Sequence, residues 1–373
     1  MLIGIDARLW SQTGVGRYIR NLTSNLSRID KKNSYVIFAG SSDFENVKKT
    51  ITSKKWKIVI ADIKWHSLSE QTSFGGLLNK YDFDVVHFPY FSVPVTYRKK
   101  YVITLHDLIV NKFKTGKAST LPYPIYLVKR TAYFLILKNA LSTCFKIIVP
   151  SNTVRNDLLS AYKSISADKV IVTYEGGFDS INEINNKEII RGKYFLRVGN
   201  FYPHKNVENL LTAFTSFTSK PKNKDIKLVL VGKKDFFFQK IESQIKSLNL
   251  ENNVVFIENP SDEDLLSLYK YAIATVIPSY MEGFSLTAVE AMSVGSVVLA
   301  SDIEVHREIC KDAAIFFNPQ DTKDIREKLS LVLEDNGQRE KLIQKGYKRV
   351  SVFSWEKMAK QTLDIYESSD SIR

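Results

Sequence analysis

Cysteine is scarce in this chain. Two of its 373 residues are cysteines, Cys144 and Cys310, and they lie far apart without metal-ligand spacing. Structural zinc sites need clustered cysteines or histidines, and small secreted domains need paired cysteines for their disulfides. The sequence therefore excludes a zinc-stabilised or disulfide-stabilised scaffold, and it fits a reducing cytoplasm.

Long apolar runs are also missing. No stretch approaches the roughly 18 to 20 consecutive apolar residues that span a membrane. The N-terminal segment MLIGIDARLW contains Asp6 and Arg8 where a signal peptide needs an unbroken apolar run. We therefore expect a cytoplasmic protein, either soluble or peripheral on the inner face of the membrane.

Acidic residues are under-represented in the first half of the chain. Residues 1–180 contain 26 lysines and arginines against 13 acidic residues, whereas residues 181–373 contain 27 of each, so the first half accounts for the net charge of +13. A basic domain favours an anionic partner, which could be a membrane surface, a lipid-linked phosphate or nucleic acid. We find no nucleic-acid-binding motif or stacking platform, and we expect no nucleic-acid partner.

Apolar, β-branched runs recur at the spacing of alternating strands and helices. Continuous runs of this kind are typical of parallel strands buried on both faces of a sheet. A chain of this length with 44% hydrophobic residues can bury two cores. The first series of runs is 2–5, 35–39, 58–61, 85–88, 101–105, 147–150 and 170–174, and the second is 194–198, 228–231, 254–257, 274–278, 297–300 and 314–317.

These runs predict an α/β protein with two doubly wound, Rossmann-like domains. We place the first domain at residues 1–180 and the second at residues 181–354. The polar, Asn-rich stretch 179–193 is the best candidate for the linker. The C-terminal segment 355–373 contains a predicted helix that begins at Trp355.

The stretch PSYMEGFSLTAVEA, residues 278–291, carries the clearest functional signal. It reads as the end of a buried strand, a glycine turn and a helix that begins at about Phe284. A turn of this kind directs backbone N–H groups and the positive end of a helix dipole at one point, which suits a phosphate. Glu282 and Glu290 would offer carboxylates to hydroxyl groups beside it. Alternatively, Glu282 caps the helix and Glu290 is a solvated surface charge.

The residues from Glu282 to Val298, E-G-F-S-L-T-x-x-E-A-M-S-x-G-S-V-V, resemble the E-x7-E signature of the family 4 retaining glycosyltransferases. The resemblance implies the GT-B fold, with two facing Rossmann-like domains, an interdomain cleft and a last helix that crosses back to the first domain. It also implies that Glu282 is catalytic and contacts the donor hexose, while Glu290 binds the donor ribose. The intervening donor-binding residues are Gly283, Phe284, Ser285 and Leu286. Ser285 and Thr287 stand where the family often has glycine and proline.

Two segments of the first half resemble the same family. Thr13-Gly14-Val15-Gly16-Arg17 is similar to its N-terminal glycine loop, so Gly14 and Gly16 are expected near the donor diphosphate or the acceptor. Thr104-Leu105-His106-Asp107 ends a buried strand, and the resemblance implies that His106 reaches the donor sugar with support from Asp107. Each has a plainer alternative: a glycine turn that only reverses the chain, and a hydrogen-bonded structural His–Asp pair.

A segment of the second half, from Arg197 to Asn206, also resembles the family. There the family commonly has an arginine directly after the glycine at position 199 and a lysine six residues after that glycine, and both contact the donor diphosphate. This chain retains Lys205 but has Asn200 at the arginine position. Arg197 could compensate, or strand alternation could point it away. Lys205 could instead be a solvated lysine, although a cation near a helix start opposes the dipole unless an anion is bound. Gly232 at the next strand end could admit the nucleotide base.

Residues 112–146 combine KFKTGK with a helical stretch in which Lys129, Arg130 and Lys138 alternate with aromatic and aliphatic residues. Such a helix could bind an anionic membrane surface. It could equally be a long core helix with a solvated basic face.

We therefore predict a retaining hexosyltransferase of cell-surface polysaccharide synthesis. The donor would be a nucleotide-diphosphate sugar, GDP-mannose before UDP-sugars and dTDP-rhamnose, and the acceptor a saccharide or lipid-linked saccharide. We see no Asp-x-Asp metal-binding motif, which agrees with the metal independence of the family that the chain resembles, and we expect no metal and no cofactor. The alternatives are a nucleotide-sugar epimerase of similar fold and, less favoured, a basic nucleic-acid-binding protein.

Overall fold

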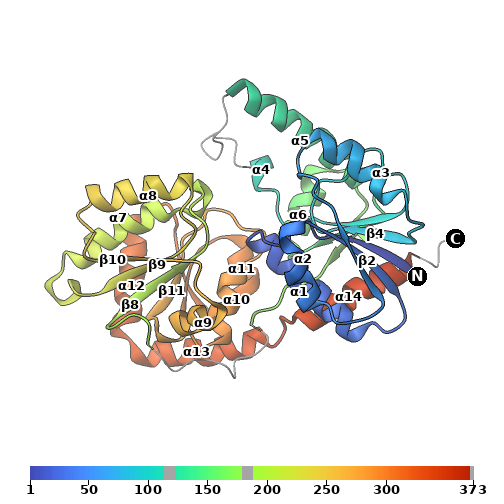
Figure 1. The fold of residues 1–373 in the computed structure, drawn as a ribbon. Coiled ribbons are helices and arrows are strands. Elements are labelled where there is room, and N and C mark those ends of the chain that lie inside the picture. Colours follow the sequence, from blue (N-terminus) through green and yellow to red (C-terminus); the bar gives the residue numbers. More distant parts are fainter. Residues whose placement is uncertain (113–122, 179–187, 370–373) are drawn as a thin grey trace. The chain divides into compact units, whose positions relative to one another are not determined.

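The computed structural model describes residues 1–112, 123–178 and 188–369. The chain forms two compact units (Figure 1). One comprises residues 1–108, 121–175 and 354–373, and the other residues 109–120 and 176–353. Part of the expected linker, residues 179–187, and the lysine-rich residues 113–117 lie outside the described residues.

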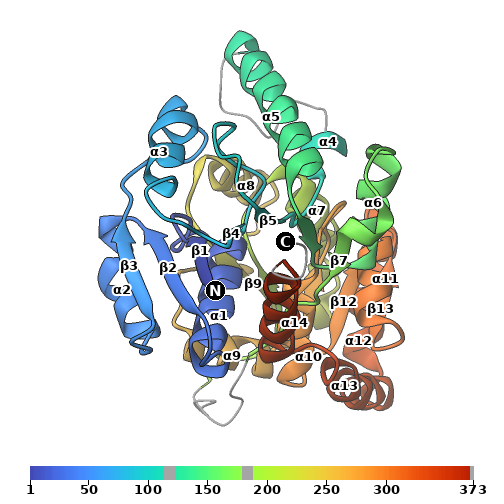
Figure 2. The same cartoon turned by 90° about the vertical axis from the view of Figure 1, so that its right-hand side faces the viewer.

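The first unit is built on a parallel sheet. Within its described residues the strand order is β3-β2-β1-β4-β5-β6-β7, and helices cover both faces (Figure 2). The strands are β1 (Leu2–Asp6), β2 (Ser34–Ala39), β3 (Trp56–Ile60), β4 (Val85–Phe88), β5 (Tyr101–Thr104), β6 (Lys146–Val149) and β7 (Val170–Val172). The helices are α1 (Gly14–Ile29), η1 (Ser41–Asp43), α2 (Phe44–Thr50), η2 (Glu70–Phe74), α3 (Gly75–Leu78), α5 (Tyr123–Thr143), α6 (Asn152–Ala161) and η3 (Ala167–Lys169).

The last helix of the chain, α14 (Trp355–Ser368), belongs to this first unit and packs along α1. Trp355 and Tyr366 of α14 are buried. The Tyr366 hydroxyl lies 2.5 Å from His87 Nδ1, and His87 Nε2 lies 2.8 Å from the Thr104 hydroxyl. A polar contact thus joins the end of the chain to β4 and β5 inside the core.

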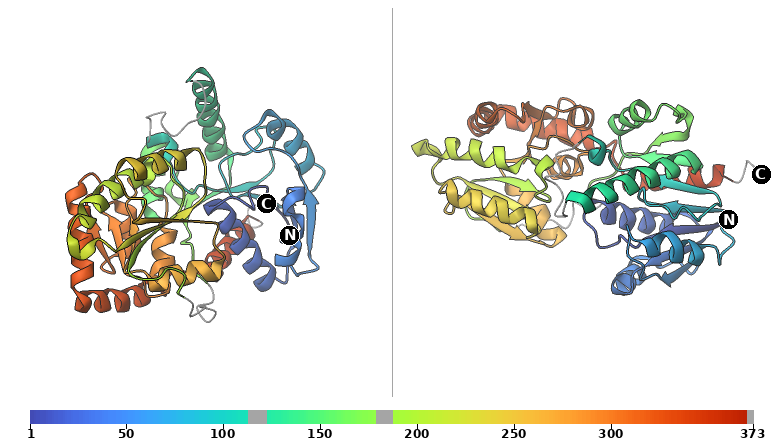
Figure 3. Two further views of the ribbon diagram at one scale, coloured as in Figure 1. Left: turned by 60° about the vertical axis from the view of Figure 1, so that its left-hand side comes forward. Right: turned by 90° about the horizontal axis from the view of Figure 1, so that it is seen from above.

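The second unit repeats the architecture with the strand order β10-β9-β8-β11-β12-β13 among its described residues. Figure 3 shows further views of its sheet and helices. Its strands are β8 (Tyr194–Val198), β9 (Lys227–Gly232), β10 (Val254–Glu258), β11 (Ala274–Ile277), β12 (Val298–Ser301) and β13 (Ala314–Phe317). Its helices are α4 (Ile109–Lys112), η5 (Pro203–Lys205), α7 (Val207–Thr218), η6 (Pro221–Asn223), α8 (Phe236–Ser247), α9 (Asp262–Tyr271), α10 (Leu286–Ser293), α11 (Glu304–Cys310), α12 (Thr322–Glu334) and α13 (Asn336–Val350).

Each unit has its own apolar core. In the first unit the core lies around Phe38, Phe74 and Phe88. In the second it lies around Phe195, Phe214 and Leu230. The inner strands are buried on both faces, which is why the sequence shows them as continuous apolar runs rather than as alternating patterns. The predicted α/β, doubly wound fold class is confirmed.

The second sheet has a topological switch point between β8 and β11. Strands β8, β9 and β10 follow one another toward one edge, and β11, β12 and β13 follow one another toward the other. The loops after β8 and β11 therefore leave the carboxyl edge of the sheet side by side and lead to different helices. Doubly wound sheets bind their ligands at this point.

Helix α5 does not fully match the expectation of a core helix for residues 112–146. Its C-terminal third packs into the core through Leu137, Ala140 and Leu141. Its N-terminal part exposes apolar side chains, and Val128 is 70% exposed. Because that part is exposed, α5 is not a core helix along its whole length. Among the described helices, none combines the length and the apolar character needed to cross a membrane.

Candidate active site

Lys205 and Glu282 meet at the switch point of the second unit. Lys205 ends η5 in the loop after β8, and Glu282 lies in the turn after β11. Lys205 Nζ is 2.5 Å from Glu282 Oε2, and both side chains are mostly buried. The Ser279 hydroxyl donates to Glu282 Oε1 at 2.7 Å. A cation near a helix start needs an anion nearby, and the carboxylate of Glu282 is that anion for Lys205.

The charge of Glu282 is set by its neighbours. Burial acts to raise the pKa of its carboxyl group, but the positive charge of Lys205 and the hydrogen bonds from Lys205 and Ser279 outweigh burial and hold the pKa below its usual value. Glu282 is therefore a carboxylate near neutral pH. Glu282 also does not cap α10, because the N-cap residue of that helix is Ser285, which makes no side-chain capping bond.

Glu290 is buried rather than solvated. Its side chain is on the inner face of α10, and Oε2 accepts a hydrogen bond from the Tyr269 hydroxyl at 2.8 Å. The alternative of a surface charge is therefore wrong. Tyr269, from α9, is a contact that sequence reasoning missed, because nothing in the sequence pairs α9 with α10.

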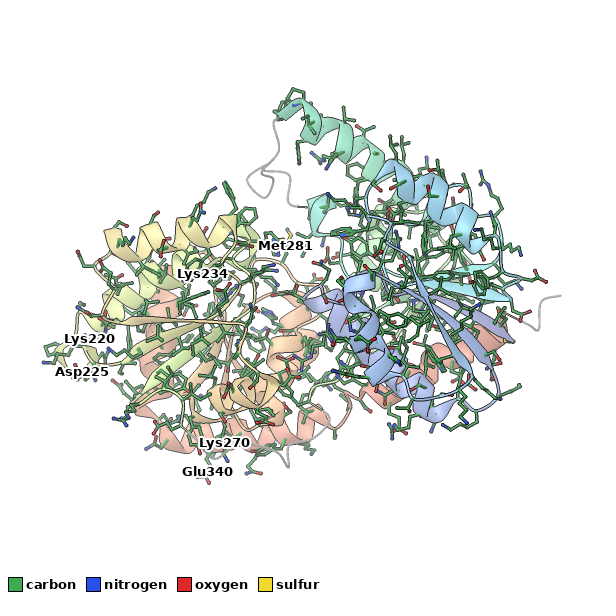
Figure 4. The ribbon with its side chains drawn as sticks, viewed as in Figure 1. Lys220, Asp225, Lys234, Lys270, Met281 and Glu340 are labelled. Carbon is green, nitrogen blue, oxygen red and sulfur yellow. The ribbon has the colours of Figure 1, made fainter. Side chains whose placement is uncertain are left out.

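The turn before α10 is tightly packed. The helix begins at Leu286, two residues later than expected, because Ser285 is its N-cap. Gly283 is buried, and the Phe284 ring packs edge-on against Phe353 with 5.8 Å between centroids. Within the described chain, the buried Ser285 hydroxyl has no hydrogen-bond partner. The first turn of α10 contains no acidic residue and no side-chain cap, so it suits an anion. The turn can be located in Figure 4 by its labelled residue Met281.

Arg197 lies beneath the loop after β8. Its side chain is buried, and it donates to the carbonyl oxygens of Gly199, at 2.5 Å, and Asn200. Burial lowers the pKa of the Arg197 guanidinium to about 10, although the negative charge of Glu282 acts to raise it. Arg197 thus points toward this loop and supports its backbone. The Asn200 side-chain oxygen has no hydrogen-bond partner among the described residues.

Gly232, at the end of β9, packs directly against the loop that follows β8. A Cβ at this position would lie 2.5 Å from the Gly199 carbonyl oxygen and 2.6 Å from the Phe201 ring. The glycine at the end of β9 lets the loop after β8 pack directly against it. The side of position 232 where a Cβ would lie is therefore filled by this loop, and the expectation that Gly232 admits the nucleotide base stays a prediction.

His306 is a buried histidine that the sequence analysis did not single out. It lies on α11, and its Nδ1 is 2.9 Å from the Ser301 carbonyl oxygen. A carbonyl only accepts, so Nδ1 carries a proton, while Nε2 has no hydrogen-bond partner within the described chain. Burial lowers the pKa of His306, and Glu282 opposes this shift. His306 is thus close enough to the Lys205–Glu282 pair to respond to its charges.

In the first unit, His106 contacts two acceptors. Its Nε2 lies 3.0 Å from the Pro89 carbonyl oxygen, and its Nδ1 lies 3.4 Å from Glu175 Oε1. The Tyr18 ring packs edge-on against the imidazole with 4.9 Å between centroids. Glu175 is buried. His106 is thus surrounded by a carbonyl oxygen, a carboxylate and an aromatic ring.

The two glycines of the N-terminal loop differ. Gly14 is exposed, and a Cβ there would contact nothing within 4 Å. Gly16 is buried, and a Cβ there would collide with the carbonyl oxygens of Leu9 and Trp10. Gly16 is therefore required by packing, and Gly14 remains accessible.

Two Asp-x-Asp sequences do occur in the chain, at Asp82–Asp84 and Asp262–Asp264. Asp82 pairs with Lys99 at 2.9 Å, and Asp84 accepts from the Leu2 amide at 2.7 Å. The second pair lies in the first turn of α9, where acidic residues stabilise a helix. Among the described residues, no group of three or more His, Cys, Asp or Glu side chains could hold a metal ion.

Sequence comparison identifies relatives of both units. Residues 180–349 match the family described as "Glycosyl transferases group 1", and residues 12–176 match "Glycosyltransferase Family 4". The O-antigen chain mannosyltransferase RfbU of Salmonella typhimurium is 29% identical over 210 residues, about half of either chain (54% of each). The O-antigen chain mannosyltransferase B of Escherichia coli is 24% identical and matches 95% of this chain and 96% of its own length.

Solved structures share the fold. Sucrose-phosphate synthase from Thermosynechococcus elongatus superposes with a TM-score of 0.81 at 19% identity, covering all of both chains. Anabaena Alr3699/HepE in complex with UDP-glucose superposes with a TM-score of 0.77 at 16% identity, again over the full length of each. The two family matches, which together span most of the chain, show that the protein is a member of glycosyltransferase family 4, and the solved structures show its GT-B fold.

Proposed function

We propose that the protein transfers a hexose from a nucleotide-diphosphate sugar to a saccharide or lipid-linked saccharide acceptor, with retention of configuration and without a metal. GDP-mannose is our first candidate for the donor, because two relatives are named as O-antigen chain mannosyltransferases. The product would belong to a cell-surface polysaccharide. The observation that carries the proposal is the Lys205–Glu282 pair at the switch point of the second unit.

The pair suits a donor that combines negative charge with hydroxyl groups. Lys205 would turn its ammonium group toward the diphosphate, and the uncapped first turn of α10 would add its backbone dipole. Glu282 remains ionised and anchored by Ser279, so it can accept hydrogen bonds from the hexose. Glu290 is buried and accepts a hydrogen bond from Tyr269. To bind the ribose, its carboxylate would either accept a second hydrogen bond or give up the one from Tyr269.

In the proposed reaction the bond between the sugar C1 and the phosphate oxygen breaks, and the acceptor hydroxyl oxygen bonds to C1. The acceptor's proton passes to the leaving diphosphate on the same face of the sugar. Negative charge develops on the leaving group, and fixed positive groups lower the barrier because they need no reorganisation. Lys205 and the amides of residues 283–285 would fill this role, which in other enzymes a metal performs.

We also propose that the first unit binds a membrane surface through α5. The exposed apolar residues of its N-terminal part lie on the same helix as Lys129, Arg130 and Lys138. Apolar side chains can enter the lipid boundary while cations meet anionic headgroups. A lipid-linked acceptor would be found at such a surface.

Nucleoside diphosphate release tests the proposal. The purified protein is incubated with GDP-mannose, UDP-sugars or dTDP-rhamnose and with lipid-linked saccharide acceptors, and the product linkage is determined. We expect Lys205→Ala and Glu282→Ala each to lower turnover at least about a hundredfold with the fold intact, as the loss of a key electrostatic contact does.

The exposed ion pair Lys222–Glu334, also 2.5 Å long, supplies the matched control. Lys222→Ala and Glu334→Ala should leave transfer unchanged. Normal turnover in either Lys205→Ala or Glu282→Ala would contradict the site. Isomerisation of the donor without transfer would favour an epimerase, and salt-sensitive duplex binding without nucleotide-sugar affinity would favour a nucleic-acid-binding protein.

A further inference from the structure

Asn206 joins three loops at the carboxyl edge of the second sheet. It follows Lys205 directly and is 2% exposed. Its side-chain amide donates to the Pro278 carbonyl at 2.9 Å and to the Pro319 carbonyl at 2.8 Å. These carbonyls follow β11 and β13, whereas Asn206 itself follows β8. Both amide protons are therefore used to connect loops from three strands.

The backbone of Asn206 is left-handed, with φ 55° and ψ 38°. Glycine adopts this conformation at lower cost than any other residue, and asparagine is the next most tolerant. A purely conformational requirement would therefore be met best by glycine. The side chain adds two N–H donors that glycine lacks. They bond to the carbonyl groups of two buried prolines, Pro278 and Pro319.

We propose that Asn206 is a positioning residue that sets the contact between Lys205 and Glu282. It fixes the residue next to Lys205 to the strand end four residues before Glu282. The backbone bond from Tyr280 N to His204 O, at 2.8 Å, joins the same two loops two residues away on each loop. Lys205 thus lies between two residues, His204 and Asn206, that are bonded to the loop carrying Glu282, and its ammonium group is aligned before a donor arrives.

Asn209 strengthens the same connection. Its amide donates to the Tyr280 hydroxyl at 2.9 Å and to the Pro319 carbonyl at 3.0 Å. Asn209 lies in regular helix α7, so its backbone has no special requirement. Its loss should loosen the turn after β11 less than the loss of Asn206, because Asn206 is adjacent to Lys205.

This inference rests on the proposed function for its kinetic effect, but its geometric content can be measured separately. The test compares Asn206→Gly with Asn249→Gly. Asn249 has a similar left-handed backbone, φ 54°, on the exposed surface after α8. Two readouts are taken for each variant: kcat and KM for transfer, and the rate at which an amine-reactive reagent labels Lys205, followed by mass spectrometry with Lys222 as internal reference.

We expect Asn206→Gly to lower kcat/KM at least about tenfold, since small misplacements of a positioned group have effects of this size. We also expect Lys205 to be labelled severalfold faster, because its ammonium group leaves Glu282 more often. Asn249→Gly should change neither quantity. Unchanged Lys205 labelling and unchanged kinetics in Asn206→Gly would overturn the proposal, since glycine would then be sufficient.

If Asn206→Gly does not fold, Asn209→Ala decides, because a helical position tolerates alanine. Faster Lys205 labelling in that variant supports the proposal, and an unchanged rate overturns it. Labelling needs no substrate. A wild-type protein that transfers no sugar would contradict the proposed function, and the labelling result would still decide the role of Asn206.

Discussion

Glycine is required at position 232 by the packing of two loops. Replacement with alanine would place a methyl group 2.5 Å from the Gly199 carbonyl oxygen and 2.6 Å from the Phe201 ring. Neither neighbour is the end of a flexible side chain, so the loop that carries Asn200 must shift. We expect Gly232→Ala to lower the free energy of unfolding by about 1 to 3 kcal/mol, the usual cost of overpacking, as measured by urea denaturation.

Gly337→Ala is the matched control in the same unit. A Cβ there would meet only Asp335 Oδ1, at 3.5 Å, which is an ordinary contact. Position 337 lies in the first turn of α13, where alanine favours the helix, so the variant should be unchanged or slightly more stable. Equal free energies of unfolding in the two variants would show that the loop after β8 shifts to accommodate the methyl group at position 232 without loss of stability.

At the same residue scale, sequence reasoning identified the charged members of the site more readily than their supports. Lys205 and Glu282 were predicted because each follows a strand in a recognisable motif. Tyr269, His306 and the bonds of Asn206 were not predicted. Their partners lie on other strands and helices, and the choice among many hydroxyl and carbonyl groups is made by tertiary packing, which no local pattern encodes.

At the scale of elements, strands were predicted more accurately than helices. Every predicted apolar run of the two series corresponds to a strand of the structure, because burial on both faces leaves a continuous signal. Helix α5 was left with two interpretations, since basic and apolar side chains alternate along it. Whether such a helix is covered depends on its neighbours, and these become known only from the fold.

Helix α5 also carries the prediction of membrane binding. We expect the wild-type protein to bind anionic vesicles at low salt, and Val128→Asp with Leu135→Asp to reduce binding at least about tenfold, because each substitution replaces apolar area with charge. Both side chains are exposed, so stability should be unchanged. Vesicle flotation measures the bound fraction.

Leu68→Asp is the control, because Leu68 is an exposed leucine of the same unit that lies outside α5. It should bind as the wild type does. Wild-type protein that stays unbound to anionic vesicles at low salt would rule out the membrane proposal. Binding that Leu68→Asp and the α5 variant reduce equally would assign it to net charge rather than to α5.

At the scale of the whole molecule, each unit buries histidines that are neutral in the folded state. Burial lowers the pKa of His66 to about 4 and that of His87 to about 3 in the first unit. In the second unit, burial lowers the pKa of His204 to about 4 and also lowers that of His306. In the unfolded chain each would return to about 6.5. Four of the five histidines therefore oppose folding once they must be protonated.

The sign of the pH dependence follows from these shifts. A histidine whose pKa is depressed by folding stabilises the protein fully above about pH 6.5, and this contribution is lost as the pH falls toward the folded pKa, because only the unfolded chain then takes up a proton. Each such histidine removes up to about 1.4 kcal/mol per pH unit in that interval. Glu282 and Asp30, whose pKa values are lowered, affect the free energy of unfolding only below about pH 4.5.

We expect the melting temperature to be nearly constant from pH 8 to 7 and to fall steeply from pH 6.5 to 4.5. In His204→Gln the slope should be shallower, because one proton fewer is taken up on unfolding. A melting temperature that is the same at pH 7 and pH 5 would show that these histidines accept protons in the folded protein.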